Sequence, residues 1–299
     1  MEREKLEEAI SKANNEDSTD GMLVYYPVFG SSRDRTLQSV VNLHKDVEGL
    51  SPELINNMYQ NVRFLDPPNN TQKSILPCTP LAMIKILEHL QIYNTFLDYG
   101  KRLFGRRITV INRSEVVGRP LAALLANDGA EVYSVDVTGV QQFSRGKGLR
   151  KQQHEVSEKV GWTLEDCLRE SEVVISGVPG DNFKVPTQQV RDGAVCINFS
   201  SEKVGRCTFA VVLRRLTLCQ NFTPDIKEKA SIYVPAVGKV TIVILLRNLL
   251  VCPHCLHMPR CTPLTTLQRM VQNRPETRSQ PAAAVEKPGT VEQSAPSGQ

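Results

Sequence analysis

The sequence lacks a long hydrophobic run and any block of like charges. No apolar stretch in the 299 residues approaches the ~20 residues that a membrane-spanning helix needs. The formal net charge is only +4, and lysine and arginine are scattered along the chain, which leaves no basic footprint for nucleic acid. We therefore expect neither a membrane nor a nucleic acid among the partners of this chain.

Cysteine patterns and targeting signals are equally sparse. The eight cysteines lie mostly in apolar segments or in the tail, as is typical of an enzyme with reduced thiols. The first ten residues, MEREKLEEAI, are acidic and helical in pattern, unlike a signal or transit peptide. These features predict a cytoplasmic protein. With 40% hydrophobic residues, the chain can bury one or two sizeable cores.

A strand–loop–helix–strand unit stands in the middle of the chain. Residues 108–112 (ITVIN) read as a buried parallel strand, 119–128 as a helix, 129–130 as a turn and 131–136 (EVYSVD) as the next strand. A unit of this size is the mononucleotide-binding half of a Rossmann domain. Asp136 closes the second strand, where a carboxylate accepts hydrogen bonds from ribose hydroxyls and repels a 2′-phosphate. The unit predicts a dinucleotide-binding protein that prefers NAD.

The usual G-x-G-x-x-G fingerprint is absent from this unit. Only Gly118 sits where a backbone must approach a pyrophosphate closely. Taken alone, a strand–glycine–helix pattern fits an ordinary α/β packing turn equally well. The sequences of this loop and of several other segments have to decide between a cofactor-binding loop and a packing turn.

Several short motifs follow one another along the chain and carry a resemblance. They are DGMLVYYP at 20–27, KDVEG at 45–49, PCTP at 77–80, NRSEVVGRP at 112–120, G-x-P at 177–179 and GAVCIN at 193–198. In this order and spacing they resemble the methylenetetrahydrofolate dehydrogenase/cyclohydrolase family, over roughly residues 5–203 and 221–250. The chain is similar to the monofunctional, NAD-dependent branch of that family found in fungi.

The resemblance implies an α/β fold with two domains. We expect an incomplete α/β folate-binding domain at residues 1–98 and a Rossmann-type, parallel-sheet NAD domain at 99–250. In the first domain the pattern predicts a helix over 4–14, a buried strand over 21–28 and a helix with Thr79 as N-cap and Pro80 at its first position.

The later part of the NAD domain follows the same alternation. Strands are expected at 173–177, 194–199 and 231–235, and the resemblance implies that a helix over 241–250 packs back on the first domain. Residues 251–299 show no periodicity, and we interpret them as a disordered or misannotated tail.

Three features depart from the family pattern. The family's opening strands, with a Tyr-x-x-x-Lys segment that contacts substrate, have no counterpart before the first helix, so we expect a truncated start. Residues 204–220 interrupt the pattern, either as a retained small intron or as a genuine surface insertion, which costs little loop-closure entropy. Cys252, Cys255, His257 and Cys261 have a spacing that could hold zinc, or are out-of-family sequence; no metal is our prediction.

The reaction implied by the resemblance is oxidation of 5,10-methylenetetrahydrofolate to the methenyl form, with hydride transfer to the nicotinamide of NAD. Such an enzyme serves one-carbon metabolism and purine biosynthesis, commonly as a homodimer. The two folate nitrogens delocalise the cation, so no catalytic side chain is assigned. The expected cofactor-binding residues are Arg113, Ser114, Val117, Gly118, Asp136, Val137 and Gly177, and the expected substrate-binding residues are Asp46, Tyr25 and Pro235.

Some of these assignments have alternatives. Asp46 could be a turn acid instead of a pterin ligand, and Tyr25 could pack in the core, which is the expectation for Tyr26. Arg113 is ambiguous because NADP-using members of the family place an arginine there for the 2′-phosphate. These members have a His-Ser-like pair at the positions where this chain has Asp136 and Val137. A carboxylate repels the dianionic 2′-phosphate of NADP, so Asp136 favours NAD.

Two other functions stay open at this point. The chain could be a folate- and NAD-binding remnant without turnover, or the product of a defective gene prediction. It could also be a bifunctional, NADP-dependent dehydrogenase and cyclohydrolase. Against the latter, residues 234–241 (VPAVGKVT) have lost glycines and a proline of the family's P-G-G-V-G-P-x-T loop.

Overall fold

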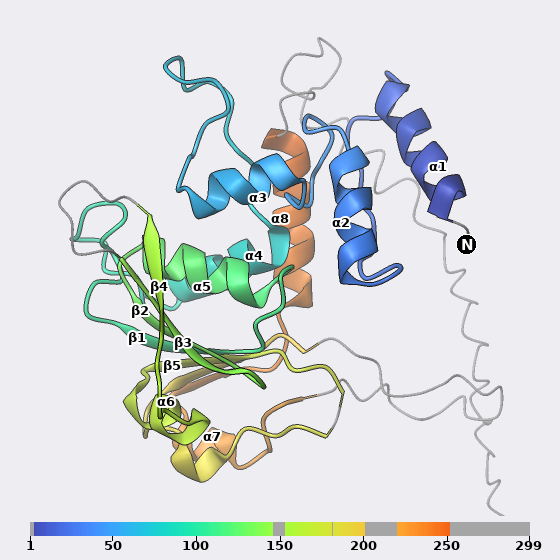
Figure 1. The fold of residues 1–299 in the computed structure, drawn as a ribbon. Helices are drawn as coiled ribbons and strands as arrows, with labels where there is room; N and C mark the ends of the chain where they lie inside the picture. The colour runs from blue at the N-terminus through green and yellow to red at the C-terminus, as the bar shows by residue number, and fades with distance from the viewer. Residues whose placement is uncertain (1–2, 146–152, 181, 201–219, 252–299) are drawn as a thin grey trace, which may run out of the picture. The chain divides into compact units, whose positions relative to one another are not determined.

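A computed structural model describes residues 3–145, 153–180, 182–200 and 220–251 (Figure 1). These residues belong to one compact unit. Nearly all of the interruption at 204–220 and all four residues of the possible zinc site lie outside the described residues. The division into domains near residue 98 stays a prediction.

Five parallel strands form most of a seven-stranded sheet, in the order β4-β3-β2-β1-β5-β6-β7. They are β1 (Arg107–Ile111), β2 (Glu131–Asp136), β5 (Val173–Ser176), β6 (Val195–Asn198) and β7 (Ile232–Val234). The strands next to the centre are buried along nearly their whole length, as expected where helices cover both faces of a parallel sheet. The predicted strands of the dinucleotide-binding unit are confirmed.

Two antiparallel strands extend one edge, so the sheet is mixed where the sequence predicted a parallel one. The chain turns directly after β2, and β3 (Gly139–Arg145) pairs back along it, with β4 (His154–Glu158) outside. Gly139 pairs with Asp136 at a φ of 117°, which a side chain would oppose. The mostly polar sequences of β3 and β4 suit an edge that is partly open to solvent.

Helices cover the two faces of the sheet. On one face lies α5 (Gly118–Asn127), in which every residue except Arg119 is buried and which is backed by α4 (Cys78–His89) (Figure 1). On the other lie α6 (Leu164–Glu170), a 3-10 turn (Thr187–Gln189) and α7 (Ile226–Lys229). Thr163 begins α6 with a reciprocal capping box.

Among the described residues before β1, the regular elements are helices joined by loops, and β-pairing is limited to isolated bridges. The helices are α1 (Arg3–Asn15), which confirms the helix expected over 4–14, α2 (Ser31–Val40), α3 (Pro52–Tyr59) and α4. The prediction of Thr79 as N-cap was wrong, because α4 already begins at Cys78 with Pro77 as its N-cap.

The prediction of a buried strand over 21–28 was also wrong. Only Met22 pairs, in a parallel bridge with Asp46, and the segment is partly exposed. Within the described part of the chain no second strand lies beside it. The segment is rich in residues that favour β-strands, but among the described residues its backbone has no neighbouring strand with which to form a hydrogen-bonded ladder.

The last described helix, α8 (Gly238–Val251), passes alongside α4 (Figure 1). Asn248 on this helix is fully buried. Its side-chain Nδ2 donates to the carbonyl oxygens of Val47 and Leu76, each at 3.0 Å. The helix α8 thus packs against residues that precede β1 in the sequence. Among the described residues, no helix has both the length and the hydropathy to cross a membrane.

We expect Asn248→Ala to lower the free energy of unfolding by about 2–4 kcal/mol, because two buried carbonyls would lose their donor. Urea unfolding measures the effect. Ile242→Ala serves as the control on the same helix, since Ile242 is 60% exposed, and it should change stability by less than about 0.5 kcal/mol. Equal effects of the two substitutions would contradict the structural role of Asn248.

Candidate functional site

The carboxyl ends of the parallel strands meet at one edge of the sheet. The loop after β1, the residues that close β2, Gly177 after β5 and Pro235 after β7 all lie at this edge. Ligands of open α/β sheets bind outside the carboxyl ends of the strands. The structure thus gathers most of the predicted cofactor residues in one place.

Gly118 allows α5 to begin directly against the end of β1. A Cβ atom on Gly118 would lie 1.8 Å from the carbonyl oxygen of Asn112, which no side chain can accommodate. The hydroxyl of Ser114 accepts hydrogen bonds from the backbone N–H groups of Val117 (3.3 Å) and Gly118 (3.2 Å). The positive N-terminus of α5 therefore faces the loop, in the position where dinucleotide-binding folds hold a pyrophosphate.

Gly177 brings the end of β5 close to the same loop. A Cβ atom there would lie 2.0 Å from the ring of Phe199. The side-chain Nδ2 of Asn112 donates to the carbonyl oxygen of Gly177 at 2.6 Å, and the N–H of Gly177 donates to the carbonyl oxygen of Ile111 at 3.2 Å. These bonds tie the ends of β1 and β5 together beneath the open edge.

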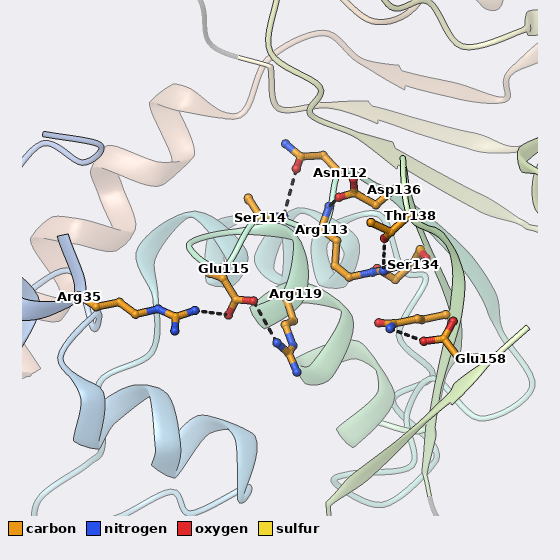
Figure 2. Close-up of polar contacts among 11 residues, drawn as sticks. Arg35, Asn112, Arg113, Ser114, Glu115, Arg119, Ser134, Asp136, Thr138 and Glu158 are labelled. Atoms are coloured by element: carbon orange, nitrogen blue, oxygen red, sulfur yellow. Dashed lines mark hydrogen bonds and ion pairs between the residues drawn. The ribbon is translucent and has the colours of Figure 1, made fainter. Parts of the chain in front are cut away.

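Asp136 is held in place by the backbone on both sides of the edge. Its Oδ2 accepts from the N–H of Arg113 at 2.7 Å (Figure 2). Its Oδ1 accepts from the N–H of Val137 at 2.7 Å. Each carboxylate oxygen has room for a second hydrogen bond. Asp136 is therefore a fixed acceptor that can receive ribose hydroxyls, while Val137 beside it is fully exposed.

The guanidinium of Arg113 is turned under the β2–β3 hairpin (Figure 2). It donates to the hydroxyl of Ser134 (3.1 Å) and of Thr138 (3.1 Å), and to the carbonyl oxygens of Ser134 (2.6 Å) and Gly139 (2.8 Å). These bonds use most of its donors. Arg113 thus braces the hairpin that carries Asp136, and its predicted contact with the cofactor stays a prediction.

Asp46 has its carboxylate occupied by the turn that it begins. Oδ1 accepts from the N–H groups of Glu48 (3.0 Å) and Gly49 (2.9 Å), and Oδ2 accepts from the N–H of Ser51 (2.7 Å). The residue is only 3% exposed. Its burial raises the carboxyl pKa, and the three backbone donors oppose this. The geometry matches the alternative of a turn acid, and contact with a substrate is not tested.

Glu48 is a functional candidate that the sequence analysis did not single out. Its carboxylate accepts from the N–H of Val24 at 3.0 Å and lines a small hollow with Tyr26 and Gln38. Burial, with a smaller contribution from the charge of Asp46, raises the pKa of Glu48 to about 7. The sequence could have indicated Glu48 as the second acid of the KDVEG motif. A tight turn has too few backbone N–H groups to occupy the acceptor oxygens of two carboxylates.

The two tyrosines before Pro27 differ in exposure. Tyr25 is 85% exposed, so it does not pack in the core and presents its ring to the solvent side of this segment. The hydroxyl of Tyr26 is buried and has no hydrogen-bond partner among the described residues, and burial beside Glu48 and Asp46 raises its pKa. Pro235 is exposed, and its carbonyl oxygen accepts from Nδ2 of Asn198 at 3.1 Å.

The described residues hold no group of three or more histidine, cysteine, aspartate or glutamate side chains that could bind a metal ion. Cys78, at the start of α4, has its thiol pKa raised by burial, with the nearby Glu48 adding to the effect. A raised pKa keeps the thiol protonated and unreactive. The site therefore offers binding and orientation, with no activated nucleophile.

Comparison with known proteins identifies relatives of this chain. A sequence model described as "Tetrahydrofolate dehydrogenase/cyclohydrolase, NAD(P)-binding domain" matches residues 77–146. The chain is 54% identical to methylenetetrahydrofolate dehydrogenase [NAD(+)] of Saccharomyces cerevisiae over 253 residues, covering 83% of this chain and 73% of that protein. The enzyme of the same name from Dictyostelium discoideum is 46% identical, with 84% and 73% covered.

A solved structure agrees with the sequence relatives. The structure of the NAD-dependent 5,10-methylenetetrahydrofolate dehydrogenase from Saccharomyces cerevisiae superposes with a TM-score of 0.74 at 53% identity. The match covers 84% of this chain and 74% of that one.

The raised pKa of Glu48 predicts a pH-dependent stability. Its folded value of about 7 lies above the ordinary 4.5, so the ionised carboxylate costs stability as the pH rises through this window. We expect Glu48→Gln to stabilise the chain by roughly 1–2 kcal/mol at about pH 8 and to have little effect near pH 4.5 or below. Thermal unfolding at the two pH values measures this, with the exposed Glu8→Gln as control. An equal effect at both pH values would contradict the burial of the charge.

Proposed function

Because the chain belongs to the tetrahydrofolate dehydrogenase/cyclohydrolase family, we propose that it oxidises 5,10-methylenetetrahydrofolate to 5,10-methenyltetrahydrofolate with NAD. The observation that carries the proposal is the carboxylate of Asp136, fixed at the end of β2 by the N–H groups of Arg113 and Val137. A fixed acceptor at this position suits the free ribose hydroxyls of NAD.

The residues at the edge of the sheet fit a dinucleotide. Gly118 lets α5 begin against the carbonyl oxygen of Asn112, so the helix N-terminus lies at the open edge, where it can attract a pyrophosphate. Asp136 would hold the adenosine ribose, and the exposed Val137 would lie against the neighbouring base. Gly177 lets the end of β5 lie against the ring of Phe199 at the same edge, and we assign its backbone to the cofactor.

When bound, NAD supplies the hydride acceptor of the reaction. The chain's own task is to position the substrate and to keep the two reacting carbons in contact. The nitrogens that flank the one-carbon bridge stabilise the cation that remains after the hydride leaves. The reaction then needs no protein base, in agreement with a site whose thiol at Cys78 is kept protonated.

Glu48 is the acid that we assign to the pterin. An ionised carboxylate accepts paired hydrogen bonds from an amino-pyrimidine edge, and these bonds lower the pKa of the acid that accepts them. Glu48 has one bond from Val24 and spare acceptor capacity, whereas Asp46 has three backbone donors. Tyr25 would offer its exposed ring to the substrate, and Pro235 would bound the site after β7.

The bifunctional, NADP-dependent alternative is less well supported. Asp136 would face the 2′-phosphate of NADP, and the guanidinium of Arg113 is engaged in the hairpin instead of being free for that phosphate. The altered loop over 234–241 also removes glycines expected for a cyclohydrolase. A folate- and NAD-binding remnant would bind both ligands without forming product.

Further aspects of the proposal concern the cell. We propose a homodimer that acts in the cytoplasm and supplies one-carbon units for purine biosynthesis, without a nucleic acid or a membrane as partner. The family resemblance supports the dimer and the pathway, and the composition of the chain supports the location. Sedimentation of the purified protein at several concentrations tests the dimer, and a monomer at all of them would contradict it.

The activity is tested by following the absorbance of the reduced nicotinamide with purified protein, 5,10-methylenetetrahydrofolate, and NAD or NADP in parallel. We expect reduction of NAD with little reduction of NADP. Equal rates with both cofactors would contradict the role of Asp136. Binding of both ligands without reduction of either would favour the non-catalytic remnant.

Asp136→Ser should lower the preference for NAD over NADP by at least tenfold, measured as the ratio of the two kcat/KM values. The substitution removes the repulsion of the 2′-phosphate, and tenfold corresponds to about 1.4 kcal/mol. Asp192→Ser is the matched control, because Asp192 lies in the β5–β6 connection with 91% of its side chain exposed. An unchanged ratio in Asp136→Ser would refute the assignment.

A further inference from the structure

A cavity of about 260 Å³ opens beside α4. It is lined by the loop before α4, by α4 itself, by residues 93–102 and by the last turns of α8, and none of the cofactor or substrate residues named above lines it. Its volume has room for roughly eight or nine water molecules or for one small metabolite. The cavity is therefore separate from the proposed dinucleotide site.

Two ion pairs stand in the lining of this cavity. Lys85 pairs with Glu88 at 2.6 Å on α4, and Arg63 lies 3.7 Å from Asp128 at the end of α5. These pairs account for both carboxylates among the lining residues. In the described part of the chain, the other cations of the lining therefore have no carboxylate left to pair with.

Three cationic side chains of the lining have no carboxylate partner among the described residues. Lys73 is exposed at the rim, and Arg247 donates only to Oδ1 of its neighbour Asn248 at 3.4 Å. Arg102 donates from Nε to the carbonyl oxygen of Leu97 at 3.3 Å and lies 4.0 Å from the ring centre of Tyr99. Like charges that converge on a cleft concentrate its field and attract an anion.

A buried hydroxyl points to the same kind of ligand. Ser74 lines the cavity next to Lys73 and is only 8% exposed, yet its Oγ has no hydrogen-bond partner in the described part of the chain. A buried hydroxyl without a partner is costly, and such groups are rare in folded proteins. An oxyanion in the cavity would accept its hydrogen bond.

We propose that this cavity is a second ligand site, for a small phosphate-bearing anion. Lysine and arginine are the side chains that bind phosphate, by charge and by paired N–H donors. The ring of Tyr99 is 85% exposed and backed by the guanidinium of Arg102, so it offers a flat surface on which a base can stack. A nucleoside monophosphate uses the ring and the cations, whereas inorganic phosphate uses the cations alone.

The wall of the cavity is connected to the substrate segment. Leu76 lines the cavity, and its carbonyl oxygen accepts from the same Asn248 amide that holds the carbonyl oxygen of Val47. Val47 stands between Asp46 and Glu48 in the turn described above. Arg247 directly precedes Asn248 in the sequence, so an anion bound by Arg247 would lie next to the hydrogen bonds that Asn248 makes to Val47 and Leu76.

The test is calorimetric titration of the full chain, saturated with NAD so that the cofactor site is filled. The probes are inorganic phosphate and adenosine monophosphate, with citrate as an anion that lacks phosphate. We expect saturable binding of phosphate probes with one site per chain. Lys73→Gln combined with Arg247→Gln should weaken it at least tenfold, and Lys227→Gln, an exposed lysine on α7, should change it less than twofold.

Tighter binding of adenosine monophosphate than of inorganic phosphate identifies a nucleoside phosphate as the ligand, and equal binding identifies phosphate itself. Ser74→Ala should weaken binding several-fold without lowering the unfolding temperature, because its hydroxyl has no partner to lose among the residues that the structure describes. The absence of saturable binding, binding unchanged in the double variant, or citrate bound as tightly as phosphate would each overturn the proposal. None of these readings depends on turnover.

Discussion

The close approach of Gly118 to the carbonyl oxygen of Asn112 is the constraint on which the site depends. A side chain at this position would collide with the end of β1, so α5 could not begin where it does. Because α5 begins there, its N-terminus faces the open edge of the sheet, and Ser114 can cap it from the loop. The carboxyl ends of β2 and β5 then complete the edge around this fixed point, with Asp136 on one side and Gly177 on the other.

In the proposed function, the choice of cofactor follows from a brace that lies behind Asp136. Arg113 holds the β2–β3 hairpin with its guanidinium and holds Asp136 with its backbone N–H. The same residue that could bind a 2′-phosphate in an NADP enzyme is here part of the support for a carboxylate that repels it. Two neighbouring acids near the proposed substrate site also have different roles. Asp46 accepts three backbone hydrogen bonds and holds the turn, whereas Glu48 accepts one from Val24 and keeps free acceptor capacity.

The sequence was sufficient for the dinucleotide-binding half and less so for the rest. The parallel strands are largely apolar and rich in β-branched residues, so their local pattern and their tertiary setting agree. The segment over 21–28 has the same composition but pairs only through Met22, and pattern alone cannot show whether a partner strand is present. The polar edge strands β3 and β4 carry weak periodicity. The roles of Asp46 and Arg113 depended on which backbone groups face each side chain, and spacing does not reveal that.

The central claim is that Asp136, fixed at the end of β2, receives the adenosine ribose of NAD at the edge organised by Gly118. A crystal structure of the chain with NAD bound tests this directly. The account predicts both ribose hydroxyls within hydrogen-bonding distance of the Asp136 carboxylate, the pyrophosphate at the N-terminus of α5, and the guanidinium of Arg113 still bound to Ser134 and Gly139. A ribose turned away from Asp136, or Arg113 released from the hairpin to bind the cofactor, would contradict it.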